Sequence, residues 1–162
     1  MTQHLWTLIG KYAHRGLFLD TNVLLLHFIG GFREDLISRF KRTSQFTPDD
    51  FRLLRRVLSR FQPWVTTPNV LTEVNGLSSQ LGEPLKTEYF VSFARGITLL
   101  AEEYVPSTKA ASGEVFPRLG LTDAGIVEAV RGRYLVLSDD LELTRYLAGL
   151  GVDALNFNHL RA

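Results

Sequence analysis

The chain has 162 residues, of which 45% are hydrophobic, and its 18 basic and 17 acidic residues leave a net charge of +1. We therefore expect a single domain spanning residues 1–162. The near-neutral charge argues against a global electrostatic attraction to nucleic acid. Because the sequence contains no cysteine, disulfides and thiolate metal sites are excluded, and any bound metal must use oxygen or imidazole ligands.

The first residues, "MTQHLWTLIGKYAHRG", lack a basic flank followed by a long apolar run. No segment of the sequence approaches the ~18 consecutive apolar residues of a membrane span. We therefore expect a soluble, cytoplasmic protein that does not enter a membrane.

The first third of the chain alternates between helical and strand patterns. Helical spacing of Leu5, Leu8 and Tyr12 predicts an N-terminal helix within residues 1–15. "GLFLD" then predicts a short buried strand. A helix capped by Asp20 or Thr21 should follow and end at the break "GG" after "NVLLLHFI".

Residues 32–62 read as a helical insert. "FREDLISRFKR" has apolar residues at helical spacing, and Thr47 and Pro48 mark the start of a further helix. The polar face of that helix is basic, and residues 31–62 carry 8 Lys/Arg against 4 Asp/Glu. A solvated helix face is the favoured interpretation, and contact with phosphate is the alternative.

The remaining chain continues the alternation. Thr67 and Pro68 predict the start of a helix, and residues 87–104 have helical spacing, whereas residues 105–120 read as mostly loop. Thr122 should cap the helix "DAGIVEAVRG". "RYLVLS" and "VDALNF" read as strands on either side of a helix in "DDLELTRYLAGLG". Strands separated by helices predict an α/β fold with a parallel sheet covered on both faces, a three-layer α/β/α sandwich.

Acidic residues fall where ligands bind in such a sheet. Asp20 follows the first strand, Asp139 and Asp140 follow "RYLVLS", and Asp123 opens a helix. The strands of a parallel sheet share one carboxyl edge, so these acids should meet there. Glu73, in a helix with apolar neighbours, joins them if that helix packs over the same edge.

Crowded carboxylates repel one another unless a cation lies between them, and Mg²⁺ and Mn²⁺ prefer oxygen ligands. The sequence thus suggests a divalent metal site. The alternative is structural, because acids at helix starts act as caps or dipole partners worth ~1 kcal/mol and need no further role. Asn22 either belongs to the helix or orients the Asp20 carboxylate, and Ser138 can be a cap.

Four segments, "LFLDTNVLLL", "TTPNVLTEVNGL", "LGLTDAGIVEAV" and "YLVLSDDLEL", occur in the order typical of the PIN domain family of metal-dependent nucleases, which the chain resembles from residue 16 to about 157. The resemblance implies a PIN-like parallel sandwich and cleavage of RNA, or less often DNA, with Mg²⁺ or Mn²⁺. Many small members are toxins of toxin-antitoxin pairs, so an antitoxin partner is also implied. The helix before the first strand and the insert at 32–62 depart from the compact members of the family.

The resemblance assigns roles to individual positions. Asp20, Asp123 and Asp140 correspond to metal ligands, and Glu73 to a ligand or to an acid that positions the attacking water. Ser138 and Asn22 would orient carboxylates. Asp139 competes with Asp140 as the fourth acid. The expected products carry 5′-phosphate and 3′-hydroxyl ends.

Other functions stay open at the level of sequence. One is a PIN-like module that binds RNA or protein without catalysis, and another is a phosphatase-type enzyme with Asp20 as nucleophile. The latter usually has a second aspartate two residues on, where this chain has Asn22. A structural α/β domain is the third alternative. The apolar stripe of the first helix and the insert are also candidates for homodimer formation or inhibitor binding.

Overall fold

The computed structural model describes residues 2–161 and is built on a five-stranded sheet. The strands are β1 (Leu17–Leu19), β2 (Trp64–Thr66), β3 (Ala101–Glu102), β4 (Leu135–Ser138) and β5 (Ala154–Asn156). Their order is β3-β2-β1-β4-β5, and every neighbouring pair is parallel. In the register, Leu17 of β1 lies opposite Trp64 on one side and Leu135 on the other. The predicted parallel α/β sheet is confirmed.

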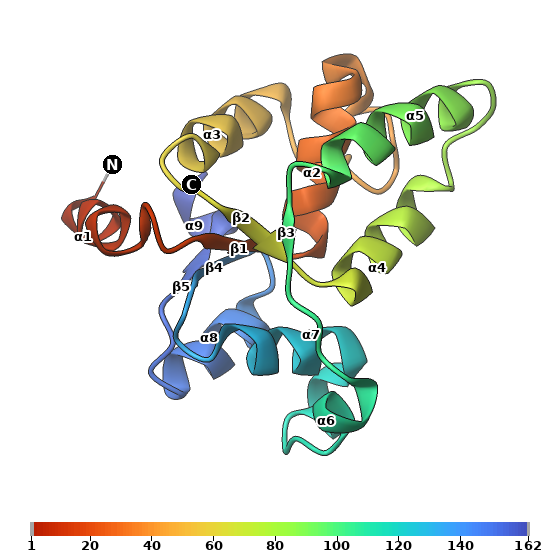
Figure 1. Cartoon of the computed structure of the whole chain (residues 1–162). Helices are drawn as coiled ribbons and strands as arrows, with labels where there is room; N and C mark the ends of the chain where they lie inside the picture. The colour runs from red at the N-terminus through yellow and green to blue at the C-terminus, as the bar shows by residue number, and fades with distance from the viewer. Residues whose placement is uncertain (1, 162) are drawn as a thin grey trace.

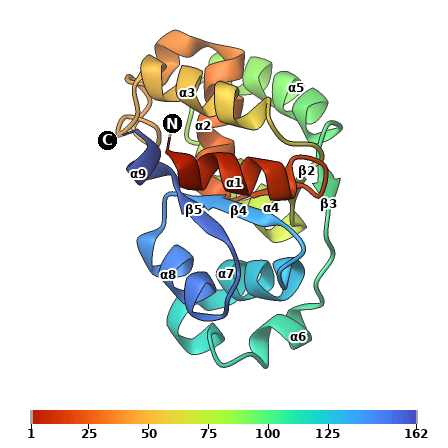
Figure 2. The same cartoon turned by 90° about the vertical axis from the view of Figure 1, so that its left-hand side faces the viewer.

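Helices cover both faces of this sheet (Figures 1 and 2). They are α1 (Gln3–Tyr12), α2 (Thr21–Phe32), α3 (Pro48–Leu58), α4 (Pro68–Ser78), α5 (Leu85–Ile97), α6 (Ser107–Ala111), α7 (Phe116–Val130), α8 (Leu141–Gly149) and α9 (Phe157–Leu160), with a 3₁₀ turn at Glu34–Leu36. The group α1, α2, α3 and α5 lies on one side of the sheet, and α6, α7 and α8 lie on the other. This arrangement is consistent with a three-layer α/β/α fold. Met1, the first residue of the predicted helix 1–15, lies outside the described residues.

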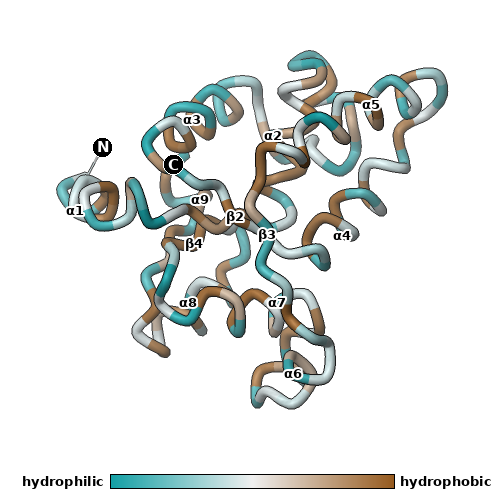
Figure 3. Tube along the Cα trace, in the orientation of Figure 1, coloured by the Kyte–Doolittle hydropathy of each residue, from teal (hydrophilic) through white to brown (hydrophobic). Residues whose placement is uncertain are grey.

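The hydrophobic core is centred on the two middle strands. Every residue of β1 and β4 is fully buried, as expected for parallel strands with helices on both faces. Figure 3 shows hydrophobic residues concentrated where helices meet the sheet. The carboxyl ends of β1 and β4 are therefore held rigidly side by side, and the residues that follow them share one edge.

Local helix signals in the sequence are confirmed. Thr47 caps α3 by accepting from the Asp50 backbone N–H, and Asp50 in turn accepts from the Thr47 N–H. Thr67 caps α4, with Pro68 in the first turn. Asp20 caps α2, its carboxylate accepting from the Thr21 N–H.

The predicted end of α2 at Gly30 and Gly31 is wrong, because the helix continues to Phe32. The ring of Phe51 on α3 lies directly against Gly30, where a Cβ atom would come within 2.5 Å of the ring. Glycine at this position permits close packing of α2 against α3 instead of ending the helix.

The helix predicted in "FREDLISRFKR" is also absent. After the 3₁₀ turn, residues 37–46 form turns, in which the Thr43 hydroxyl donates to the Ile37 carbonyl at 2.8 Å. Phe40 and Phe46 are buried nonetheless. The apolar residues of this segment therefore reach the core from an irregular backbone. Apolar residues at helical spacing are thus not sufficient to identify a helix here.

Two further expectations need correction, and one strand was missed. The helix expected over residues 87–104 ends at Ile97, and Ala101–Glu102 form the edge strand β3. The predicted loop 105–120 contains α6 and the start of α7, which bends at Gly120 with φ of +82°. Strand β2 was not predicted at all.

Within residues 2–161, no helix combines the length and the apolar character that crossing a membrane requires.

Candidate active site

A cavity of about 420 Å³ opens at the carboxyl edge of the sheet. Its lining residues come from α2, α4 and α7 and from the segments that follow β1 and β4, and Figure 1 shows how these elements are arranged. Five of its lining residues are acidic: Asp20, Glu73, Asp123, Asp139 and Asp140. The rest are three polar residues, Thr21, Asn22 and Thr122, and Leu77, Leu119, Gly120 and Leu121. The acids predicted to meet at one sheet edge, which come from four separate segments, are thus brought together.

Asp20 forms the floor of the cavity and is 6% exposed. One carboxylate oxygen accepts from the Thr21 N–H at 2.7 Å, and the other accepts from the Ser138 hydroxyl at 2.5 Å. Burial raises the pKa of Asp20 to about 6 despite these hydrogen bonds, and the charges of Asp139 and Asp140 act in the same direction. Ser138 therefore orients the Asp20 carboxylate, as predicted.

Glu73 lines the cavity from α4 and is exposed, so α4 packs over the sheet edge as the grouping of the acids required. Two threonine hydroxyls hold its carboxylate, Thr21 at 3.0 Å to one oxygen and Thr122 at 2.7 Å to the other. These bonds join α4 to the starts of α2 and of the second part of α7. Thr122 is thus not the helix cap that the sequence suggested.

Asp123 lies in the first turn after the bend at Gly120. Burial, together with the charges of Asp20, Asp140 and Glu73, raises its pKa to about 7. No hydrogen bond from any residue in the range 2–161 compensates for this cost. Asp123 is therefore the carboxylate whose negative charge is least well accommodated by its surroundings.

Asp139 and Asp140 have different environments. Asp140 caps α8, with one oxygen accepting from the N–H groups of Glu142 and Leu143. Asp139 accepts from the side-chain amide of Asn22 at 3.1 Å, and burial raises its pKa. Asn22 thus orients Asp139 and not Asp20, which corrects one of the two readings of this residue.

No basic residue neutralises this group of carboxylates. The cavity lining contains no Lys, Arg or His, and within the described part of the chain none of the five acids forms an ion pair. Arg118, which precedes the cavity-lining segment 119–123, pairs with Glu142 outside the lining. The acids therefore sit together without an internal counterion.

The donor set fits a hard divalent cation, because Mg²⁺ and Mn²⁺ bind carboxylate oxygens. A closed cage is not formed, however. Among residues 2–161, no three Asp, Glu or His side chains are positioned to hold one ion together. Several oxygens already accept hydrogen bonds from Thr21, Ser138 and Thr122. The fit is thus to an ion that keeps part of its water shell, as Mg²⁺ usually does, or to side chains that rotate on binding.

Sequence reasoning missed the supporting role of three side chains. Thr21 and Thr122 clasp Glu73, and Gln45, from the turns of residues 37–46, donates to Asp139 at 3.4 Å. The threonines each stand next to a candidate acid in the sequence, which was a usable signal. Nothing local to Gln45 indicated its position.

Comparisons of this chain with models of known protein families, with curated proteins and with solved structures gave no match.

Proposed function

We propose that the chain is a metal-dependent nuclease that hydrolyses phosphodiester bonds at the acidic cavity, with RNA as its main substrate. The observation that carries this proposal is the set of five carboxylates around one cavity. The lining of the cavity contains no basic residue, and none of the five acids forms an ion pair with any residue in the range 2–161. Folding such a group together costs free energy unless a cation joins it. A site that tolerates this cost is a candidate for function and not only for capping.

In the proposed mechanism, Asp20, Asp123 and Asp140 would hold Mg²⁺ or Mn²⁺, directly or through water. The ion would supply activated water and neutralise charge that develops on the phosphate. Glu73, held by Thr21 and Thr122, would accept a hydrogen bond from the attacking water and fix its orientation. Ser138 holds the Asp20 carboxylate in place, and Asn22 does the same for Asp139.

Asp140 is the better candidate for the fourth acid. Its charge acts on the pKa of both Asp20 and Asp123, whereas Asp139 contributes to that of Asp20. Asp139 is also tied to Asn22 and Gln45. We therefore assign Asp139 a supporting role.

The choice of RNA, and membership of the PIN family, rest on the resemblance of the four sequence segments. The prediction of an antitoxin partner has the same basis. The proposed cytoplasmic location rests instead on the lack of cysteine and of long apolar runs in the sequence. The apolar stripe of α1, Leu5, Leu8 and Tyr12, is buried in the core, so it does not support the suggested homodimer, which rests on the insert alone. The non-catalytic binding module is the alternative function, and a metal titration separates the two, because the module needs no ion.

The phosphatase alternative loses support from the position of Asp20. A nucleophilic carboxylate must reach the phosphorus atom of the substrate, but both oxygens of Asp20 accept hydrogen bonds and the side chain is almost entirely buried. This geometry suits a carboxylate that is held in place as a ligand.

The test is cleavage of single-stranded RNA, folded RNA and matching DNA by wild type, Asp20→Asn and Asp123→Asn, each with EDTA, Mg²⁺ or Mn²⁺. Asp49→Asn is the matched control, because Asp49 is an exposed acid on α3 that does not line the cavity. All four proteins are purified identically, since trace ribonuclease imitates activity.

We expect cleavage that requires metal, produces 5′-phosphate ends, persists in Asp49→Asn and falls at least a hundredfold in both cavity variants. Equal activity in all four proteins would refute the proposal. Recovery of 2′,3′-cyclic phosphate ends would overturn the proposed chemistry, because such ends arise from attack by the RNA 2′-hydroxyl and not by water.

A further inference from the structure

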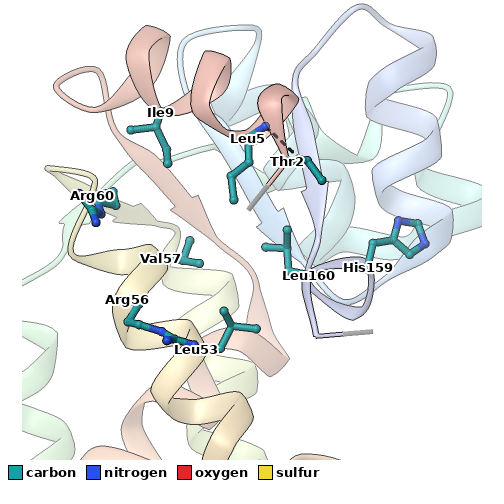
Figure 4. Close-up of a pocket in the computed structure, with 9 residues that line it drawn as sticks. All are labelled: Thr2, Leu5, Ile9, Leu53, Arg56, Val57, Arg60, His159 and Leu160. Carbon is teal, nitrogen blue, oxygen red and sulfur yellow. Dashed lines mark hydrogen bonds between the residues drawn. The ribbon is translucent and has the colours of Figure 1, made fainter.

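A second cavity, of about 430 Å³, lies between α1 and α3 and shares no lining residue with the acidic one. Its lining comprises Thr2, Leu5, Ile9, Leu53, Arg56, Val57, Arg60, His159 and Leu160 (Figure 4). We call it the α1–α3 pocket. Its volume falls in the range of ~300–1,000 Å³ that is typical of small-molecule sites.

The interior of the pocket is apolar. Leu5 and Ile9 lie one turn apart on α1, and they face Leu53 and Val57, one turn apart on α3. Leu160 of α9 closes one end. Leu5 and Val57 are buried, so the pocket floor is part of the core, whereas Ile9 and Leu53 remain partly exposed at its sides. An apolar chain in this groove would be removed from water on both sides, worth ~0.8 kcal/mol per buried methylene.

The rim of the pocket is positively charged. Arg56 lies along α3 beside Leu53, Arg60 lies near Ile9, and His159 stands at the far end (Figure 4). The lining contains no acidic residue, and within residues 2–161 neither arginine forms an ion pair. The Arg60 guanidinium lies 5.7 Å from the centre of the Trp6 ring, which limits the positions it samples. Arg56 of α3 and Arg60, just beyond the end of that helix, are therefore available to bind an anion.

We propose that the α1–α3 pocket binds a small anionic amphiphile, a molecule with one carboxylate or phosphate head and an apolar tail. The tail lies between α1 and α3, and the head accepts charge-assisted hydrogen bonds from Arg56 or Arg60. Guanidinium groups bind both kinds of head through paired hydrogen bonds. A hydrophilic anion leaves the apolar walls unused, and a neutral apolar ligand leaves the arginines unused, so the amphiphile is the class that matches both features. This inference does not depend on the nuclease proposal.

The test is isothermal titration calorimetry of the full chain with octanoate, decanoate and decyl phosphate, each below its micelle-forming concentration. Decan-1-ol, which has the same tail without the charge, is the ligand control. Arg56→Gln and Arg60→Gln are the test variants. Both side chains are exposed, so these substitutions leave the core intact. Arg15→Gln is the matched control, because Arg15 is exposed, lies over an aromatic ring, that of Tyr12, and does not line the pocket.

We expect saturable binding of one anionic amphiphile per chain, weakened about tenfold by Arg56→Gln or Arg60→Gln and unchanged by Arg15→Gln. Lengthening the tail from octanoate to decanoate should strengthen binding by up to fourfold per methylene. The decanoate and decyl phosphate titrations show which head is preferred. The proposal is overturned if none of the anions binds saturably, if both arginine variants bind like wild type, or if decan-1-ol binds as tightly as decanoate.

Discussion

Asp123 offers the sharpest test of how far uncompensated charge in the acidic cavity destabilises the fold. Its pKa is about 7 in the folded protein against 3.8 for an unperturbed aspartate. The sign follows from this raised value: the folded state binds the proton more tightly, so ionised Asp123 destabilises the fold at pH above 7, and the destabilisation is relieved as the pH falls toward 3.8. Asp123→Asn removes the charge, and within the described residues it breaks no side-chain hydrogen bond.

The difference between a pKa of 3.8 and one of about 7 sets a ceiling of about 4 kcal/mol on the gain in stability at pH 8. Asp123 is only partly buried, so solvent screening reduces this to on the order of 1–2 kcal/mol. For a domain of this size the melting temperature of metal-free Asp123→Asn should rise by about 2–8 °C at pH 8.

The assay is thermal unfolding in EDTA at pH 8 and pH 5. At pH 5 the wild-type carboxyl is already protonated in the folded state, so the gain should fall to less than half. Added Mg²⁺ should stabilise wild type more than the variant, because ligand binding to the folded state raises stability. A variant that melts at or below the wild-type temperature at pH 8 would refute the account of the cavity as a site of uncompensated charge.

Three further predictions address individual contacts. Ser138→Ala removes the hydroxyl that orients Asp20, so the affinity for Mn²⁺ measured by calorimetry should fall about 10- to 100-fold. An unchanged affinity would show that Asp20 is not a ligand of the metal. Gly30→Ala should destabilise the protein by about 1–2 kcal/mol in urea unfolding, because the new Cβ would meet the Phe51 ring. Gly31→Ala is the control and should be neutral or stabilising, because open space surrounds Gly31. Equal effects of the two substitutions would contradict the packing argument. Burial lowers the pKa of His27 from 6.5 to about 4, so the contribution of His27 to stability is present above pH 6.5 and is lost as the pH falls toward 4. Between pH 7 and pH 4.5, the free energy of unfolding should therefore fall by about 1–3 kcal/mol less in His27→Phe than in wild type. Parallel pH profiles of the two proteins would show that His27 does not cause the loss of stability.

Features that depend on a few neighbouring residues were predictable from the sequence. The caps Thr47 and Thr67 were found because a hydroxyl residue followed by proline acts within one turn. Strands β1 and β4 were found because each is an uninterrupted apolar run.

Features that depend on distant partners were not predictable. Strands β2 and β3 have three and two residues, too few for a periodic pattern, and they exist because they extend the sheet beyond β1. The continuation of α2 through Gly30 depends on Phe51, which is 21 positions away along the chain. In both cases the deciding contact lies outside any local window.

The acidic cavity shows the same division. The rule that parallel strands share a carboxyl edge correctly predicted that Asp20, Asp123, Asp139 and Asp140 would line one site, and Glu73, expected there only if its helix packed over that edge, lines it too. It did not predict which group each polar side chain would hold. Asn22 binds Asp139, and Thr122 binds Glu73, because side-chain direction is set by packing and not by order along the chain.

The most direct test of the central claim is X-ray diffraction from crystals grown with Mn²⁺, using the anomalous signal of the metal to locate it. The account predicts one Mn²⁺ in the acidic cavity, with carboxylate oxygens from at least two of Asp20, Glu73, Asp123 and Asp140 bound directly or through water. An empty cavity at saturating Mn²⁺, or an ion bound only elsewhere on the surface, would contradict it.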